Sequence, residues 1–128
     1  MSWRKKVVWS EGMLLQPQHL QQSERHADHA RHLLLRSTSP YAWGFAEIEI
    51  DSAALALGKL ALTRAVGVFG DGTPFDMPAV DPLPEALDIP EGLRDEAIVL
   101  ALPLRRAGAR EADAEGYEDL VRHRVQEA

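Results

Sequence analysis

The sequence predicts a mainly β fold, an antiparallel β-sandwich preceded by one N-terminal α-helix. Apolar residues recur every three or four positions in a single stretch near the N-terminus, which is the period of a helix. After Tyr41 the period changes to two, as in strands with one face buried. Turn-forming and proline-rich segments separate the alternating stretches, an order typical of short strands packed as two sheets.

The helix is predicted over residues 17–36. Pro17 suits the first turn of a helix, where its missing N–H removes no hydrogen bond. Small residues in the middle of one helix face allow another backbone to approach closely, so this face is expected to pack. Pro40 disfavours helical geometry in the residue before it and marks the end. The residues of that face are Leu20, Ser23, Ala27, Ala30 and Leu34.

The strands are predicted to begin at about residue 44. In "FAEIEID", Ala46, Ile48 and Ile50 alternate with acidic residues, which predicts a half-buried strand. The alternation continues on both sides of Gly58-Lys59, so a tight hairpin turn is predicted there.

The later part of the chain is predicted to hold a long loop and two more strands. Prolines punctuate residues 73–90, which indicates an irregular connection without a regular strand ladder. Residues 97–104, "AIVLALPL", are apolar almost throughout and predict a strand buried on both faces. A small charged loop over 107–119 and a last strand over 120–125 follow.

The composition excludes several classes of function. The 128 residues carry a net charge of −6, which disfavours a nucleic-acid partner that needs a basic surface. There is no cysteine, so disulfides, thiolate nucleophiles and sulfur-ligated zinc are excluded. No apolar run has the length of a signal peptide or a membrane span, so a soluble cytoplasmic protein without membrane insertion is expected. The final strand lacks a partner in the sequence, which suggests a piece of a longer protein.

No catalytic or cofactor motif is complete. The sequence has no nucleophile elbow, and its glycine-rich "GVFGDGTPFD" lacks the lysine and hydroxyl residue of a phosphate loop. We therefore expect no enzyme activity and no cofactor. Four histidines at helical spacing leave one alternative, a small metal- or ligand-binding module, although no three of them converge on one ion. They are His19, His26, His29 and His32.

Aromatic residues flank the predicted helix on both sides. Trp3 and Trp9 precede it, and Tyr41 and Trp43 follow it. Tryptophan is enriched both in cores and at binding hot spots, so these residues either pin the helix to the sheet or form an interaction surface.

The stretch "VVWSEGMLLQPQHLQQSER", Val7 to Arg25, closely resembles the N-terminal signature of the TssK family, the baseplate subunits of bacterial type VI secretion systems. Leu20 stands where the family often has phenylalanine, an apolar exchange. The resemblance continues in order through three further blocks, Pro40–Asp51, Gly58–Pro78 and Ile98–Leu104.

This resemblance implies a non-enzymatic structural adaptor. Residues 1–128 would be a truncated N-terminal shoulder domain, a β-sandwich similar to the shoulder of phage receptor-binding proteins. In the family this domain docks onto a wedge of TssF and TssG and takes part in a homotrimer, at a baseplate recruited from the cytoplasm to the inner membrane. A phage tail adaptor with the same shoulder fold is a further alternative.

The partner-binding surface is predicted at the start of the signature. Glu11-Gly12 would set a turn, Met13 and Leu14 would offer apolar contact, and Pro17 would fix the start of the helix. The alternative is that the same residues form an internal clasp between helix and sandwich. The predicted set is Trp9, Glu11, Met13, Leu14, Pro17, His19, Leu20 and Trp43.

Overall fold

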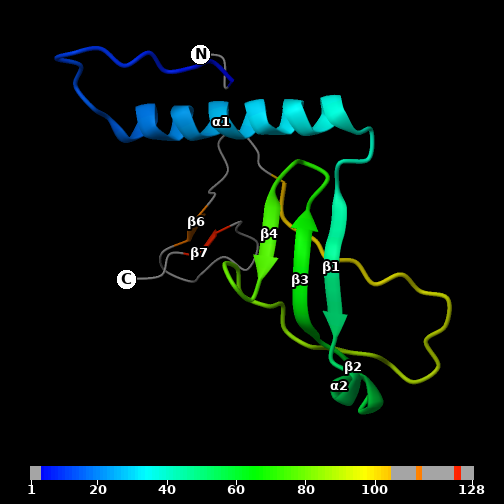
Figure 1. Cartoon of the computed structure of the whole chain (residues 1–128). Coiled ribbons are helices and arrows are strands. Elements are labelled where there is room, and N and C mark those ends of the chain that lie inside the picture. Colours follow the sequence, from blue (N-terminus) through cyan, green and yellow to red (C-terminus); the bar gives the residue numbers. More distant parts are fainter. Residues whose placement is uncertain (1–3, 105–111, 114–122, 125–128) are drawn as a thin grey trace. The chain divides into compact units, whose positions relative to one another are not determined.

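The computed structural model describes residues 4–104, 112–113 and 123–124. The chain divides into two compact units, Met1–Glu91 and Gly92–Ala128. In the first unit an extended N-terminal arm leads into a long helix, and an antiparallel sheet follows (Figure 1). This order of a leading helix and antiparallel strands is the one that the sequence predicts.

The long helix α1 spans Pro17–Thr38 and ends two residues beyond the predicted limit. Pro17 occupies its first turn, as expected. Its last turn is held by hydroxyls that donate back to helix carbonyls, Ser37 to Leu33 at 2.7 Å and Thr38 to Leu35 at 2.8 Å. Ser39 then leaves the helix in an extended conformation one residue before Pro40.

The main sheet has three antiparallel strands in the order β1-β3-β4, formed by Gly44–Ile50, Leu62–Val68 and Pro74–Met77. Phe75 is the largest buried side chain at its centre, with Ala65 and Met77 beside it. The Phe75 ring meets Phe45 edge-on, with centroids 5.6 Å apart, and lies 4.8 Å from Phe69. This aromatic cluster joins all three strands on one face.

On β3, Gly67 allows the strands to come close together. A Cβ at this position would overlap the Gly44 carbonyl oxygen and the Phe75 ring. The opposite face is polar, where Arg64 donates to Glu47 at 2.5 Å. This hydrogen bond and the carboxylate charge raise the pKa of Arg64 above its ordinary value.

The outer edges of this sheet, at β4 and at β1, differ in how they are covered and hydrogen-bonded. At β4, the Asp81 carboxylate accepts from the Asp76 N–H at 3.0 Å, and the Asp76 carbonyl accepts from Val80 at 2.8 Å. The loop after β4 therefore satisfies the hydrogen-bonding groups of Asp76 at the outer edge of β4. Among the described strands, β1 pairs with β3 alone, and Ile48 and Ile50 on it are about half exposed.

The predicted hairpin turn at Gly58-Lys59 is wrong. Ser52–Ala56 forms the short helix α2, which Asp51 caps by accepting from the Ala53 and Ala54 N–H groups at 2.9 and 3.1 Å. Gly58, with φ of 79°, then reverses the chain into β2, Lys59–Leu60.

The predicted loop over residues 73–90 is interrupted by two strands. β4 starts at Pro74, a strand position that needs no N–H, and ends before Pro78. β5, Leu87–Asp88, pairs antiparallel with β2, and Asp88 also makes an ion pair with Lys59 at 3.3 Å. Prolines therefore bound these short strands rather than exclude them.

The second unit also differs from the prediction. Residues 97–104 form no regular strand, and Val99 is exposed, because no described strand pairs with them. β6, Ala112–Asp113, lies in the predicted loop 107–119 and pairs in parallel with β7, His123–Arg124. The rest of that loop and of the predicted strand 120–125 lies outside the described residues. None of the described helices is long and apolar enough to cross a membrane.

Candidate functional site

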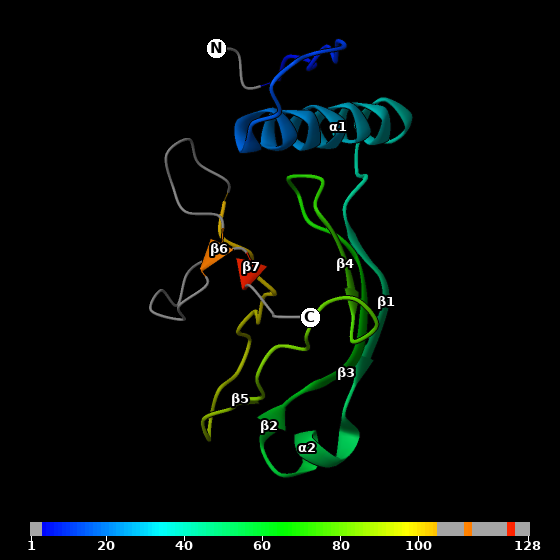
Figure 2. The same ribbon diagram turned by 90° about the vertical axis from the view of Figure 1, so that its left-hand side faces the viewer.

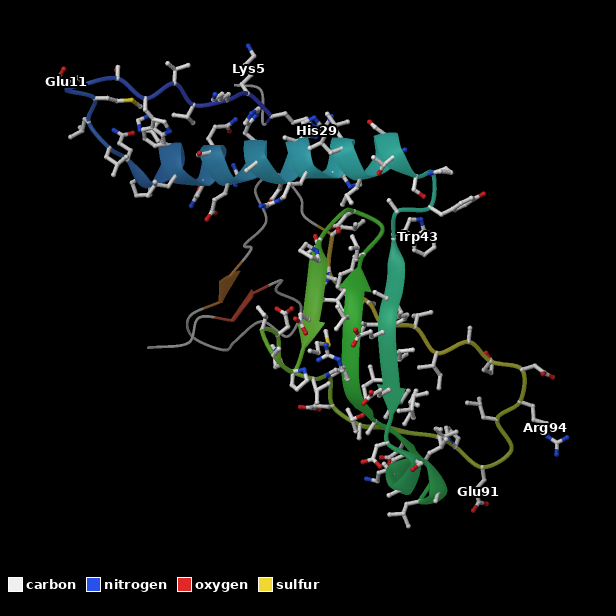
Figure 3. The ribbon with its side chains drawn as sticks, in the orientation of Figure 1. Lys5, Glu11, His29, Trp43, Glu91 and Arg94 are labelled. Carbon is white, nitrogen blue, oxygen red and sulfur yellow. The ribbon has the colours of Figure 1, made fainter. Side chains whose placement is uncertain are left out.

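The candidate site is built on the N-terminal arm, residues 4–16, which folds back along α1 (Figure 3). The tip of the arm is a turn in which the Met13 N–H donates to the Ser10 carbonyl at 3.2 Å. Gly12 occupies the third position of this turn with φ of 78°, a conformation that favours glycine. Glu11-Gly12 therefore forms the predicted turn, and Figure 3 shows Glu11 at its outer end.

The beginning of the arm is fastened to α1 through its main chain. The Gln22 side-chain amide donates to the Lys5 carbonyl at 2.5 Å. One turn later, His26 Nδ1 lies 3.0 Å from the Arg4 carbonyl, to which it donates. Both helix side chains bind carbonyl oxygens, so the path of the arm is set without use of the Arg4 and Lys5 side chains.

The middle of the arm meets the first turn of α1 at His19. The Trp9 and His19 rings are nearly perpendicular, with centroids 6.4 Å apart. His19 Nδ1 also accepts from the N–H of Gln16, the residue that precedes the helix, at 3.3 Å. His19 thus closes the helix start and contacts the arm, which is a structural use of this ring.

The arm exposes apolar side chains. Leu14 is 77% exposed and Leu15 59%, and Val8 and Trp9 are also open to solvent. Met13, between the turn and Leu14, is only partly exposed. Neighbouring exposed apolar side chains on a fixed backbone are typical of a surface that another protein covers. Val8 and Leu15 are outside the predicted set, although Val8 directly precedes Trp9 and Leu15 directly follows Leu14.

Not all predicted residues come together. Pro17 and Leu20 lie at the start of α1 beside the arm, and both are exposed. Trp43 follows the other end of the helix, which its 22 residues make about 33 Å long. Figure 3 places Trp43 at the top of β1, far from Glu11. The site that the structure assembles, called the arm site below, contains Trp9, Glu11, Met13, Leu14, Leu15, Pro17, His19 and Leu20.

A third histidine contacts the sheet. The turn between β3 and β4 lies under α1 (Figure 2), and a Cβ at Gly72 would overlap the His32 imidazole. Gly72 has φ of 85°, so both its conformation and this contact require glycine. Among the described residues, no group of three or more histidine, aspartate or glutamate side chains is arranged to hold a metal ion.

Comparison with known proteins identifies the family to which this chain belongs. The family model described as bacterial type VI secretion, VC_A0110, EvfL, ImpJ, VasE matches residues 19–128. The chain belongs to this type VI secretion family. A curated relative, the baseplate component TssK1 of Pseudomonas aeruginosa strain PAO1, is 49% identical over 116 residues. That match covers 91% of this chain and 26% of the relative, so the chain spans about a quarter of the relative's length.

Solved structures of TssK show the same fold. A TssK crystal structure matches with a TM-score of 0.82 and 38% identity, over 94% of this chain and 28% of that one. A TssK–TssF–TssG baseplate subcomplex, solved by cryo-electron microscopy, matches with a TM-score of 0.76 and 30% identity. That alignment covers 93% of this chain and 40% of its counterpart. The resemblance of the sequence to TssK and the predicted fold class are thus confirmed.

Proposed function

We propose that this chain is a non-enzymatic structural adaptor of the type VI secretion baseplate, and that its arm site docks onto a wedge of TssF and TssG. The family membership supports a baseplate role, and the cryo-electron microscopy relative is a TssK–TssF–TssG subcomplex. The observation that carries the choice of surface is the arm itself. It is fastened by its backbone while Leu14 and Leu15 face solvent.

The arm site has the composition of a binding surface. Its centre is apolar and includes a tryptophan, and polar groups such as Glu11 lie at its border. The fixed backbone lowers the conformational entropy that binding would cost. The alternative to an interface is that the same residues form an internal clasp between helix and sandwich. However, the hydrogen bonds that hold the arm to α1 are accepted by Arg4 and Lys5, which precede these residues. The carbonyls of Arg4 and Lys5 bind the helix, and the side chains after Gly12 remain available.

The test is co-elution of the chain with a purified TssF–TssG complex in size exclusion with light scattering. Leu14→Asp should reduce binding at least tenfold, because a carboxylate would be desolvated in an apolar contact. Leu57→Asp is the matched control, since Leu57 is 81% exposed but follows α2, away from the arm. Equal binding by both variants would contradict the proposal, and so would a wild-type chain that ignores the wedge.

A comparison of variants at Met13 and Leu14 distinguishes an effect on wedge binding from an effect on folding. Because it is partly buried, Met13→Asp should lower the free energy of unfolding as well as wedge binding. Leu14→Asp should leave the free energy of unfolding within about 0.5 kcal/mol of the wild-type value, as for other exposed substitutions. A large loss of stability in Leu14→Asp would instead make the arm an internal clasp.

The wider assembly follows the family. We propose that residues 1–128 form part of the N-terminal shoulder domain, that the complete protein forms a homotrimer, and that it works in the cytoplasm at the inner-membrane-associated baseplate. Trp43, outside the arm site, is proposed as a second contact because it is 64% exposed. Trp43→Ala in the complete protein should weaken wedge binding in the same co-elution assay, and unchanged binding would contradict this second contact.

A further inference from the structure

Charge is distributed unevenly along the sequence. With neutral histidines, residues 1–40 hold six basic and three acidic side chains, a formal charge of +3. The whole chain carries −6, so residues 41–128 carry −9. The arm and α1 are therefore the basic part of an acidic chain. The six basic residues are Arg4, Lys5, Lys6, Arg25, Arg31 and Arg36.

Half of these basic residues are consecutive at the start of the arm. Arg4, Lys5 and Lys6 are all exposed, and we call them the basic segment. Within the part of the chain that the structure describes, none of the three makes an ion pair. Figure 3 shows the Lys5 side chain directed away from α1. Glu11, the one acidic residue of the arm, lies at the other end of it.

The main chain of the basic segment is held in place, and its side chains take no part in holding it. His26 and Gln22 donate to the carbonyls of Arg4 and Lys5, at 3.0 and 2.5 Å. Basic side chains on a fixed backbone lose less conformational entropy on binding than those of a free chain. Because guanidinium and ammonium groups are donors only, the ligand that matches the basic segment is an anionic group such as a carboxylate.

The surroundings of the basic segment favour an acidic protein as this ligand. Trp9, an exposed residue of the arm site, follows Lys6 by three residues, about 10 Å along an extended chain. Charged residues that border an apolar centre are typical of a protein–protein interface. Electrostatic attachment to membranes commonly takes about four to eight clustered basic residues. Nucleic acids require a more extended basic surface than these three residues provide.

We propose that the basic segment binds an acidic patch on the TssF–TssG wedge, beside the place where the arm site docks. This inference rests on the proposed function and adds to it the charge of the partner's surface. Carboxylates of the wedge are attracted at the basic segment and repelled by the −9 of residues 41–128, so the wedge approaches the arm first. Exposed charges at the border of an interface act mainly on the association rate constant, whereas apolar contacts act on the dissociation rate constant.

The rate constants of binding between the full chain and purified TssF–TssG, measured by biolayer interferometry at several salt concentrations, test this. Lys5→Glu together with Lys6→Glu should lower the association rate constant at least tenfold at low salt, and the difference should shrink as salt screens the charges. The dissociation rate constant should change by a smaller factor. Lys5→Arg together with Lys6→Arg keeps both charges and should associate at the wild-type rate.

Arg36→Glu together with Arg94→Glu is the control. Both residues are exposed and lie outside the arm, and the pair changes the net charge by the same amount. This control should associate within about twofold of the wild-type rate. Equal slowing by the two charge-reversed pairs would overturn the proposal, because the effect would then follow net charge rather than the basic segment.

Unchanged association of the Lys5→Glu and Lys6→Glu variant would overturn the proposal as well. Loss of binding to phosphatidylserine vesicles by the same variant would then assign the basic segment to a lipid. Leu14→Asp acts on the dissociation rate constant, so the docking of the arm site and the role of the basic segment can fail separately. A wild-type chain that does not bind the wedge would overturn both.

Discussion

The contact between Gly72 and His32 predicts how much of the free energy of unfolding is lost when one methyl group is added at position 72. In Gly72→Ala, the new Cβ would enter the space of the His32 imidazole. The residue would also keep φ of 85°, which costs an L-amino acid about 1–2 kcal/mol. Displacing the half-buried imidazole adds about 1–3 kcal/mol, the usual range for overpacking. We therefore expect a loss of about 2–5 kcal/mol from the free energy of unfolding.

The second part of this cost depends on the ring. In a His32→Ala background the methyl group meets no imidazole, so Gly72→Ala should cost only the backbone part, about 1–2 kcal/mol. The coupling between the two substitutions should then be about 1–3 kcal/mol, as for residues in direct contact. Urea denaturation of the four proteins, followed by far-ultraviolet circular dichroism, gives this value. Equal costs of Gly72→Ala in the two backgrounds would refute the contact between α1 and the β3–β4 turn.

Three further predictions follow from the first unit. Phe75→Ala should lower the free energy of unfolding by about 3–5 kcal/mol, because the ring is buried between Phe45 and Phe69. Chemical denaturation measures this loss, and a loss below about 1 kcal/mol would contradict the prediction. Asp51→Ala should cost about 1 kcal/mol through loss of the α2 cap, whereas Asp51→Ser, which keeps a capping oxygen, should retain most of the stability in the same assay. Glu47→Gln should change stability by less than about 1 kcal/mol, because its ion pair with Arg64 is exposed to solvent; a thermal melt at low and high salt would reveal a larger contribution.

Local chemistry made the helix predictable. Pro17 at the start and Pro40 after the end fix α1 from its own residues, and the structure follows them closely. The cap at the helix start was not foreseen, because Gln16 and His19 are unusual residues for this role. The signal for α2 was present in Asp51, a good capping residue, but the alternation of leucine and alanine around it fits a strand equally well.

Non-local pairing was the part that the sequence could not supply. β4 was not predicted because Pro74 and Pro78 lie at its two ends. Prolines at these positions bound a strand but do not prevent it. Residues 97–104 have the composition of a buried strand, yet a strand forms only where another strand offers its edge. At the candidate site, the predicted turn at Glu11-Gly12 was found. Trp43 was grouped with the arm by its residue type, and the length of α1 separates them.

The way α1 holds the arm has a consequence for sequence divergence. Every amino acid carries a carbonyl, so the bonds from Gln22 and His26 survive almost any replacement of Arg4 or Lys5. At these two bonds, selection for the fold therefore acts on Gln22 and His26 and leaves the side chains of Arg4 and Lys5 unconstrained. An arm of this kind can change its outward side chains, and with them its choice of partner, while its anchorage stays the same.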